Sequence, residues 1–248
     1  MTVFPSIGKA SATPDEVVCR SRLVWQWPIR VFHWTFAFSV VVLFVTGLYI
    51  NEPWFTAGGG TDHYLMGWVR GAHFTAAALF CVAFFWRIFW FWFGNRYARS
   101  GFPYVWRPRW WRDLFQQAWD YLRFDFGTPH MGHNALAGLA YTVFAIGLGW
   151  GQIITGLALF GESNPGGFFD GLFGWALPLF GGSFRTHMWH HLFAWGFAFF
   201  VVLHVYIVLL DDRQYLNGLV SSMISGRKFY RRKLSDHQEQ EDEEDGCE

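Results

Sequence analysis

Four long apolar stretches dominate the pattern of hydrophobic and polar positions along the chain. They cover residues 31–50, 71–93, 135–160 and 188–210, and each has the roughly 20 residues that a helix needs to cross a bilayer. A segment inside a bilayer must satisfy its backbone hydrogen bonds internally, so each stretch is expected to be helical. The pattern therefore predicts an all-α integral membrane protein, a multi-pass four-helix bundle whose first partner is the lipid bilayer.

Two other segments carry different patterns. Residues 168–184 are apolar but contain Asp170, Pro178 and four glycines, which indicates an interfacial or re-entrant segment rather than a fifth span. Residues 109–126, between the second and third stretches, place apolar side chains at helical spacing with polar side chains on the opposite face. This predicts an interfacial amphipathic helix between helices two and three, lying on the inner membrane surface as an anchor.

The distribution of Lys and Arg predicts the orientation. The two tails and the connection between the second and third stretches hold 17 of the 19 basic residues, and the opposite side holds only Arg70 and Arg185. The positive-inside rule then places both termini in the cytoplasm, with the bundle in a bacterial cytoplasmic (inner) membrane. The expected organisation is a cytoplasmic tail at 1–23, a membrane domain at 24–230 and a tail at 231–248. That last tail is strongly acidic and is expected to be disordered.

Composition excludes several other classes of protein. The 248 residues are 52% hydrophobic, 22% aromatic and only 15% charged, which excludes a disordered chain. Nineteen Lys and Arg balance 19 Asp and Glu, so no overall field favours nucleic acid as a partner. The three cysteines lack the spacing of a metal knuckle or a disulfide framework.

Histidines within the apolar stretches are the candidate chemistry, because ionisable residues at membrane depth are rare and usually functional. In the predicted topology His33 and His204 lie near the inner boundary, whereas His73 lies near the outer boundary with His190 or His187. Imidazole is a common axial ligand of haem iron, and helix bundles hold cofactors between facing helices. The matching depths predict two bis-histidine haem sites, one near each side of the membrane.

Helical geometry distinguishes the candidates on the fourth stretch. His190 and His204 are 14 residues apart, which corresponds to about 1400°, within roughly 40° of one face, and to a rise of about 21 Å. His187 is about 100° away from that face. His190 is therefore the predicted outer ligand, and His187 is the alternative. A single zinc site is disfavoured because these histidines differ too much in depth. A lone histidine near an interface, such as His33, also has a simpler interpretation as a headgroup contact.

Short motifs surround these histidines, at residues 30–34, 43–47, 67–74, 94–96, 132–134, 154–156 and 189–204. Together they resemble the b-type cytochrome subunit of membrane-bound nickel–iron hydrogenases. That subunit is similar to the gamma subunit of formate dehydrogenases and to prokaryotic cytochrome b561. In this dihaem cytochrome b group, four helices carry two haems b, and two ligands lie 14 residues apart on the last helix, the spacing of His190 and His204. One departure is Met188, where a small residue is expected.

The resemblance also implies partners and a function. Electrons from periplasmic hydrogen oxidation would arrive through the iron–sulfur clusters of the hydrogenase small subunit, which connects this chain to the large subunit. The chain is expected to anchor that enzyme and to pass electrons to quinone, without catalytic residues or hydrogen chemistry of its own. One alternative is the same electron path serving another dehydrogenase, of the formate dehydrogenase or cytochrome b561 type. An alternative from another class is a haem-free membrane anchor or transporter.

Quinone reduction needs an apolar slot and proton-donating groups near the inner haem. His133 and Asn134 precede the third stretch at that depth, and Arg30 and Trp34 lie near it on the first. An imidazole with a pKa near neutrality can protonate a quinone oxygen, and an amide can orient the ring. The simpler interpretation is that His133 and Asn134 only begin a helix and bind headgroups.

Overall fold

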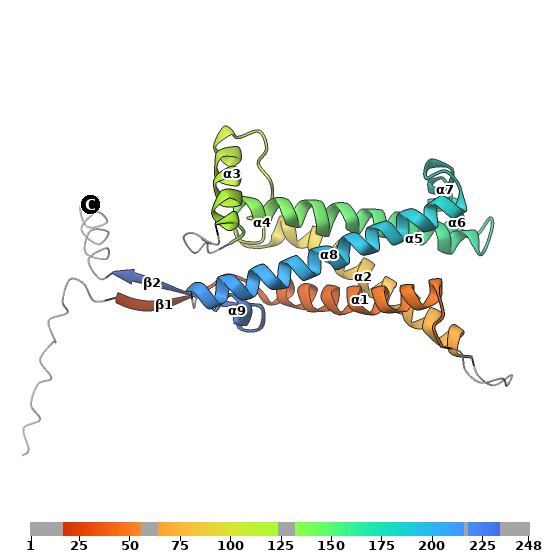
Figure 1. Cartoon of the computed structure of the whole chain (residues 1–248), viewed down its shortest axis with the longest axis horizontal. Helices are drawn as coiled ribbons and strands as arrows, with labels where there is room; N and C mark the ends of the chain where they lie inside the picture. Colours follow the sequence, from red (N-terminus) through yellow and green to blue (C-terminus); the bar gives the residue numbers. More distant parts are fainter. Residues whose placement is uncertain (1–16, 56–63, 124–131, 216–217, 234–248) are drawn as a thin grey trace, which may run out of the picture.

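The computed structural model describes residues 17–55, 64–123, 132–215 and 218–233. Four long helical segments run side by side (Figure 1). They are α1 (Trp27–Asn51), α2 (Leu65–Phe93), a third segment made of α4 (Ala135–Ala140), the π-helix η1 (Tyr141–Leu148) and α5 (Gly149–Glu162), and α8 (Ser183–Tyr215). Each is long and apolar enough to cross a membrane, which confirms the predicted four-helix membrane fold.

Local sequence signals define where these segments begin. Pro28 lies in the first turn of α1, where its missing N–H is not needed. The side-chain oxygen of Asn134 accepts a hydrogen bond of 2.7 Å from the backbone N–H of Ala137 and so caps α4. Gly181 and Gly182 form the turn directly before α8. Their φ angles of 88° and 95° are values that glycine adopts without a steric cost.

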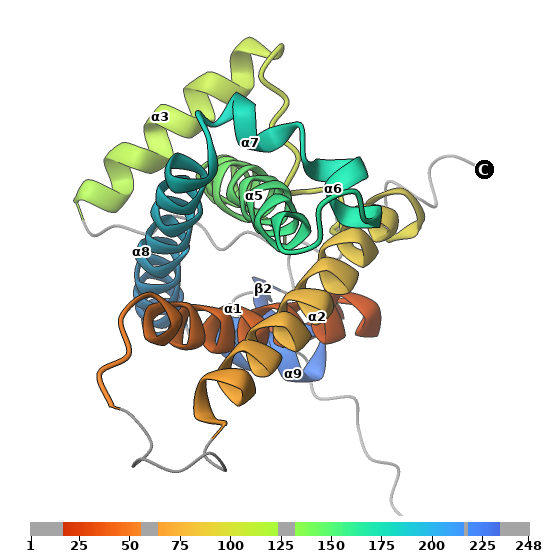
Figure 2. The same cartoon turned by 90° about the vertical axis from the view of Figure 1, so that its right-hand side faces the viewer.

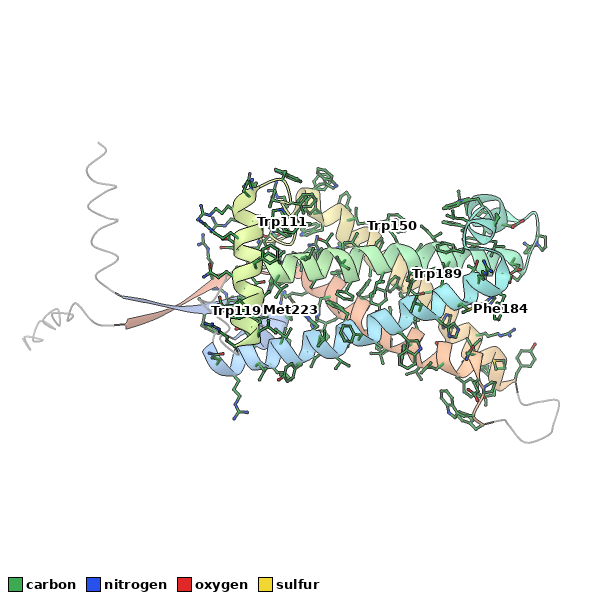
Figure 3. The ribbon with its side chains drawn as sticks, turned by 45° about the horizontal axis from the view of Figure 1, so that its top comes forward. Trp111, Trp119, Trp150, Phe184, Trp189 and Met223 are labelled. Carbon is green, nitrogen blue, oxygen red and sulfur yellow. The ribbon has the colours of Figure 1, made fainter. Side chains whose placement is uncertain are left out.

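The surface of the bundle is apolar, and its buried core is small. Phe38, Trp92 and Val202 are 65%, 72% and 69% exposed on three different spans, which suits contact with lipid rather than water. Figure 3 shows such side chains along the whole length of the bundle. The core at mid-length is formed by four buried side chains, Phe80, Phe84, Ile153 and Phe197.

Helix α3 (Pro108–Leu122) lies across one end of the bundle, nearly perpendicular to the long helices (Figure 1). Tyr121 and Gln117 attach it to the start of the third span: the Tyr121 hydroxyl accepts from Asn134 Nδ2 (2.9 Å), and the Gln117 side chain accepts from the backbone N–H of Leu136 (3.2 Å). The amphipathic helix predicted at 109–126 is therefore present but ends at Leu122. Residues 124–131 lie outside the described part of the chain, and the position of α3 on a membrane surface stays a prediction.

The segment predicted not to span forms two short helices, α6 (Phe168–Phe173) and α7 (Ala176–Leu179). They fold against α5 and α8 (Figure 2), at the opposite end of the bundle from α3 (Figure 1). With six and four residues, neither can cross a bilayer, so the prediction that this segment is not a fifth span is confirmed.

A two-stranded antiparallel sheet joins β1 (Val17–Leu23) to β2 (Arg227–Lys233) beside the short helix α9 (Leu219–Ser225). The register runs from Val17 opposite Lys233 to Leu23 opposite Arg227. Two backbone hydrogen bonds extend this pairing toward the bundle. The N–H groups of Val24 and Trp25 both donate to the carbonyl of Gly226, at 2.9 and 3.0 Å.

This sheet was not expected, because pairing between segments at opposite ends of a chain leaves no local pattern. It places strands inside the predicted tail 1–23 and across the predicted boundary at 230/231. The remaining parts of both tails lie outside the described residues. We call the end of the bundle that carries the sheet and α3 the sheet end, and the other the α6–α7 end.

Candidate functional site

At the sheet end, α1 and α8 bring His33 and His204 together. Their ring centroids are 6.4 Å apart, with 52° between the ring planes. Taking about 2 Å for a metal–imidazole bond, two rings on opposite sides of one iron have centroids roughly 6 Å apart. The ring of His204 is exposed and stacks on Phe200 at 5.5 Å, and Nδ1 of His33 is buried with no hydrogen-bond partner among the described residues. This spacing fits a haem iron held by two imidazoles.

At the α6–α7 end, His73 of α2 and His190 of α8 lie close enough to interact electrostatically. Each is supported by a threonine: Nδ1 of His73 lies 2.8 Å from Oγ1 of Thr46, and Nδ1 of His190 lies 2.8 Å from Oγ1 of Thr155. When Nδ1 carries this contact, Nε2 is the nitrogen left for a metal. Both rings are therefore oriented as axial ligands usually are.

Glycines make room for these two rings. A β-carbon at Gly156 would lie 3.0 Å from Cε1 of His190, and one at Gly47 would lie 3.5 Å from Cε1 of His73. The side-chain amide of Gln152 also donates a hydrogen bond of 3.1 Å to the backbone carbonyl of His190. Helix α5 thus contacts both the ring and the backbone of His190, and Gly156 on the same helix leaves room for the ring.

The other histidines at this end have different surroundings. His187 is exposed, and its Nδ1 lies 3.1 Å from the carbonyl oxygen of Ser183 one turn earlier. His191 is half-buried and lies within electrostatic reach of His73. Among the residues that the structure describes, no three His, Cys, Asp or Glu side chains group around one point. The arrangement favours His190 over His187, and the assignment of ligands stays a prediction.

His133 contacts the side chains of three other residues at the sheet end. Its Nδ1 is 3.1 Å from Oγ of Ser100, and the rings of Trp25 and Tyr141 lie 5.2 and 5.7 Å away. Burial, with the nearby cation of Arg87, lowers the pKa of His133 to about 3. At pH 7 this imidazole is neutral, so it can share a hydrogen bond but is not a charged acid.

The other three residues proposed from the sequence for quinone have structural contacts. Asn134 uses its oxygen to cap α4 and its NH₂ group to bind the Tyr121 hydroxyl. Arg30 donates to the backbone carbonyl of Ile224, and the indole of Trp34 donates to that of Met223 at 3.0 Å. These last two contacts satisfy carbonyls at the end of α9, which otherwise lack helical partners. The structure thus shows that Asn134 begins helix α4, and a contact of Asn134 with quinone stays a prediction.

Sequence reasoning did not single out Thr46 and Thr155 as partners of the histidines. A signal for them exists, because the tripeptide Thr-Gly-Leu occurs at residues 46–48 and again at 155–157. It also passed over Arg87, which is 4% exposed, donates to the carbonyl of Ala98 at 2.8 Å and lies 5.0 Å from the centre of the Tyr141 ring. Only the folded chain shows what these polar groups contact.

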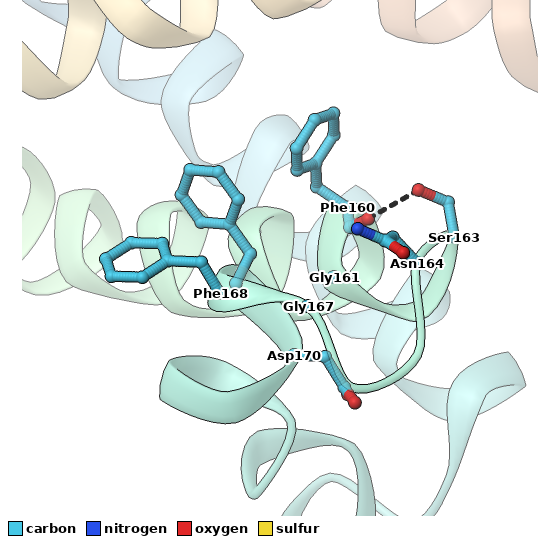
Figure 4. A pocket seen from close by; sticks show the side chains of 8 residues that line it. Phe160, Gly161, Ser163, Asn164, Gly167, Phe168 and Asp170 are labelled. Atoms are coloured by element: carbon cyan, nitrogen blue, oxygen red, sulfur yellow. Dashed lines mark hydrogen bonds between the residues drawn. The ribbon is translucent and has the colours of Figure 1, made fainter.

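The turn between α5 and α6 forms a pocket of about 350 Å³ (Figure 4). Asp170 helps to shape it by accepting a hydrogen bond of 2.8 Å from the backbone N–H of Gly166. Its lining residues are Phe160, Gly161, Ser163, Asn164, Gly167, Phe168, Phe169 and Asp170. They include none of the predicted ligands or quinone-contacting residues, so this pocket is separate from both histidine pairs.

An imidazole pair at each end of a membrane-spanning bundle is the arrangement expected of a membrane cytochrome b. Comparison with known proteins agrees. The family model for prokaryotic cytochrome b561 matches residues 24–226. A probable Ni/Fe-hydrogenase B-type cytochrome subunit of Azotobacter chroococcum mcd 1 is 39% identical over 213 residues, covering 84% of this chain and 88% of the relative.

Two more distant relatives carry similar names. A probable Ni/Fe-hydrogenase B-type cytochrome subunit of Rhodobacter capsulatus is 36% identical, with 88% of this chain and 92% of the relative covered. A probable Ni/Fe-hydrogenase 1 B-type cytochrome subunit of Escherichia coli (strain K12) is 32% identical, with 88% and 94% covered. The chain belongs to the prokaryotic cytochrome b561 family. It is a multi-pass membrane protein of the b-type cytochromes, whose cofactor is haem b.

Proposed function

We propose that the chain is a dihaem cytochrome b that anchors a nickel–iron hydrogenase and passes its electrons across the membrane to quinone. The observation that carries the proposal is the presence of two histidine pairs at the two ends of one bundle, each spanning two helices. Both pairs take one member from α8, where His190 and His204 are 14 residues apart. A single haem would need only one such pair.

Each haem has a distinct set of protein groups. His33 and His204 would hold the haem at the sheet end, and His73 and His190 the haem at the α6–α7 end. Haem would supply one-electron transfer, and with both imidazoles of a pair bound, its iron would have no position free for oxygen. At the α6–α7 end the protein orients the rings of His73 and His190 through Thr46 and Thr155. The design favours electron transfer over oxygen chemistry.

The orientation of the bundle follows from charge. The sheet end carries the basic strand β2, the start of α1 and the arginines around α3, whereas Arg70 and Arg185 lie toward the other end. The positive-inside rule places the sheet end in the cytoplasm, and with it both ends of the described chain. In this orientation α3, with exposed Trp111 and Trp119, lies at the inner surface of a bacterial cytoplasmic membrane.

The partner follows from the relatives, whose names link them to Ni/Fe hydrogenases. The iron–sulfur small subunit of such an enzyme would dock at the α6–α7 end and connect the chain to the large subunit. Quinone would be reduced at the sheet end, near His33 and His204. There His133, neutral at pH 7, is the candidate to hydrogen-bond the quinone. Asn134, through its contact with α3, and Arg30 and Trp34, through their contacts with α9, would shape the wall of the quinone site.

Haem stoichiometry tests the proposal directly. Purified full-length chain should give a reduced-minus-oxidised spectrum with a b-type α band and a pyridine haemochrome ratio near two haems per chain. His33→Ala and His73→Ala should each lower that ratio to near one, and His187→Ala is the matched control that should retain both. A chain without haem would refute the proposal and favour a plain membrane anchor.

Identification of the proteins that co-purify with the chain tests the hydrogenase assignment separately. The chain should co-purify with the small and large subunits of a nickel–iron hydrogenase and support hydrogen-dependent reduction of quinone in membranes. Two haems together with co-purification of a formate dehydrogenase instead would keep the electron path and replace the partner.

A further inference from the structure

The same arrangement, a threonine followed by a glycine on a neighbouring helix, supports both histidines at the α6–α7 end. On α1, Thr46 contacts Nδ1 of His73, which belongs to the next span, α2. On α5, Thr155 contacts Nδ1 of His190, which belongs to the next span, α8. Both distances are 2.8 Å, and a glycine follows each threonine beneath the ring. Helices α1 and α2, and α5 and α8, are packed neighbours (Figure 2).

The direction of these hydrogen bonds follows from the other contact of each hydroxyl. Oγ1 of Thr46 lies 2.6 Å from the carbonyl oxygen of Val42, and Oγ1 of Thr155 lies 2.6 Å from that of Gly151. A carbonyl only accepts, so each hydroxyl hydrogen points toward its own helix. The threonine oxygen then accepts the Nδ1–H of the histidine. Both rings are thereby held in the tautomer that presents Nε2 to a metal.

An accepted Nδ1–H bond makes an imidazole a more basic ligand. A more basic ligand stabilises ferric haem more than ferrous haem, which lowers the reduction potential. The sheet-end pair differs in this respect, because Nδ1 of His33 is buried without a partner among the described residues. At least His33 of the sheet-end pair therefore lacks, among the described residues, the hydrogen bond that both His73 and His190 have.

We infer that Thr46 and Thr155 are positioning residues that lower the reduction potential of the haem at the α6–α7 end. The inference rests on the proposed function, because it requires His73 and His190 to be ligands of one haem. A lower potential on the side where electrons enter favours their movement toward the quinone side. Two threonines thus help to set the direction of electron flow.

Isosteric substitution tests this inference. Thr46→Val and Thr155→Val remove the hydroxyl and keep the β-branched shape. Each should raise the midpoint potential of one haem and leave the other unchanged. Loss of one neutral hydrogen bond should change the relative affinity of the histidine for ferric and ferrous haem by roughly threefold. A tenfold change in this ratio shifts a one-electron potential by 59 mV, so the expected shift is about 30 mV. The double variant should show about twice the shift, in a redox titration of the α band and in the ferric EPR signal.

The chain offers matched controls. Thr142→Val removes a hydroxyl that donates to the carbonyl of Gly138 at 3.0 Å and contacts no histidine in the described part of the chain, so both potentials should stay as in the wild type. Thr46→Ser and Thr155→Ser keep the hydroxyl and remove the methyl group, so the potential should stay at the wild-type value. If the threonines acted only through their shape, the serine variants would change the potential.

Each outcome decides the question. Unchanged potentials in both valine variants with two haems bound would overturn the inference and leave the proposed function intact. If a valine variant loses haem, retention is compared after oxidation and after reduction: preferential loss of the ferric form supports the inference, and equal loss overturns it. Absence of two bis-histidine haems from the wild-type chain would instead refute the proposed function itself.

Discussion

Replacement of Gly156 by alanine is a sharp test of the site at the α6–α7 end. The added β-carbon would lie 3.0 Å from Cε1 of His190, closer than side-chain carbons normally approach. Thr155 and Gln152 hold the same histidine from the same helix, so the ring has little freedom to move away. Overpacking of this kind typically costs about 1–3 kcal/mol. Alanine also favours a helix over glycine by about 1 kcal/mol, so the helix itself should remain folded.

The cost should therefore appear in haem binding rather than in folding. At about 1.4 kcal/mol per tenfold, haem affinity at this end should fall roughly 5- to 150-fold. Transfer of haem to excess apomyoglobin, followed by absorbance, measures the change. Gly47→Ala, with its β-carbon 3.5 Å from His73, should have a small effect, and Gly71→Ala, with nothing within 4 Å, none. Equal haem retention in Gly156→Ala and Gly71→Ala would refute the packing argument.

Other predictions concern the sheet end. His33→Ala or His204→Ala should remove one haem and abolish hydrogen-dependent quinone reduction by the hydrogenase complex, while hydrogen-dependent dye reduction continues; retention of two haems would contradict the ligand assignment. His133→Ala should keep both haems and slow their reoxidation by quinone after a hydrogen pulse by roughly 2- to 13-fold, the scale of one lost neutral hydrogen bond of about 0.5–1.5 kcal/mol; unchanged reoxidation would place the quinone elsewhere. Because the pKa of His133 falls from 6.5 to about 3 on burial, its contribution to stability is present above pH 6.5 and is lost as the pH falls toward 3. Thermal unfolding in detergent should therefore be less acid-sensitive in His133→Gln, and an unaltered pH profile would argue against a buried neutral ring. Asn134→Ala should lower stability by about 0.5–2 kcal/mol through loss of the helix cap, whereas Asn134→Asp, which keeps the cap oxygen and loses the bond to Tyr121, should cost less.

Local patterns were sufficient to predict the spans and the segment that does not span. Runs of apolar residues long enough for a bilayer are visible without any tertiary contact, and so are the glycines and Pro178 that interrupt residues 168–184. The sheet could not be predicted in this way. Its strands, β1 and β2, lie at opposite ends of the chain, and their pairing depends on the bundle bringing them together.

Depth and helical angle predicted which histidines approach each other, because α8 is an uninterrupted α-helix from Ser183 to Tyr215. The same arithmetic would fail along the third span, where η1 changes the angle per residue over eight residues. Contacts of polar groups were harder to foresee. Arg30 and Trp34 bind α9, a helix that the sequence did not predict, and the partners of Thr46 and Thr155 lie on other helices.

The dependence of both histidine pairs on α8 has a consequence for biogenesis. His33 and His73 emerge early during translation, but their partners belong to the last of the four spans. If both pairs bind haem as proposed, neither can do so until nearly the whole chain has been made and the fourth span has inserted. Strand β2 is synthesised later still, so β1 cannot pair with it, its partner strand in the described sheet, until all four spans have been made. With the proposed ligands, cofactor loading would be a late event, and a ribosome that stalls before α8 would leave a nascent chain with one histidine of each proposed pair.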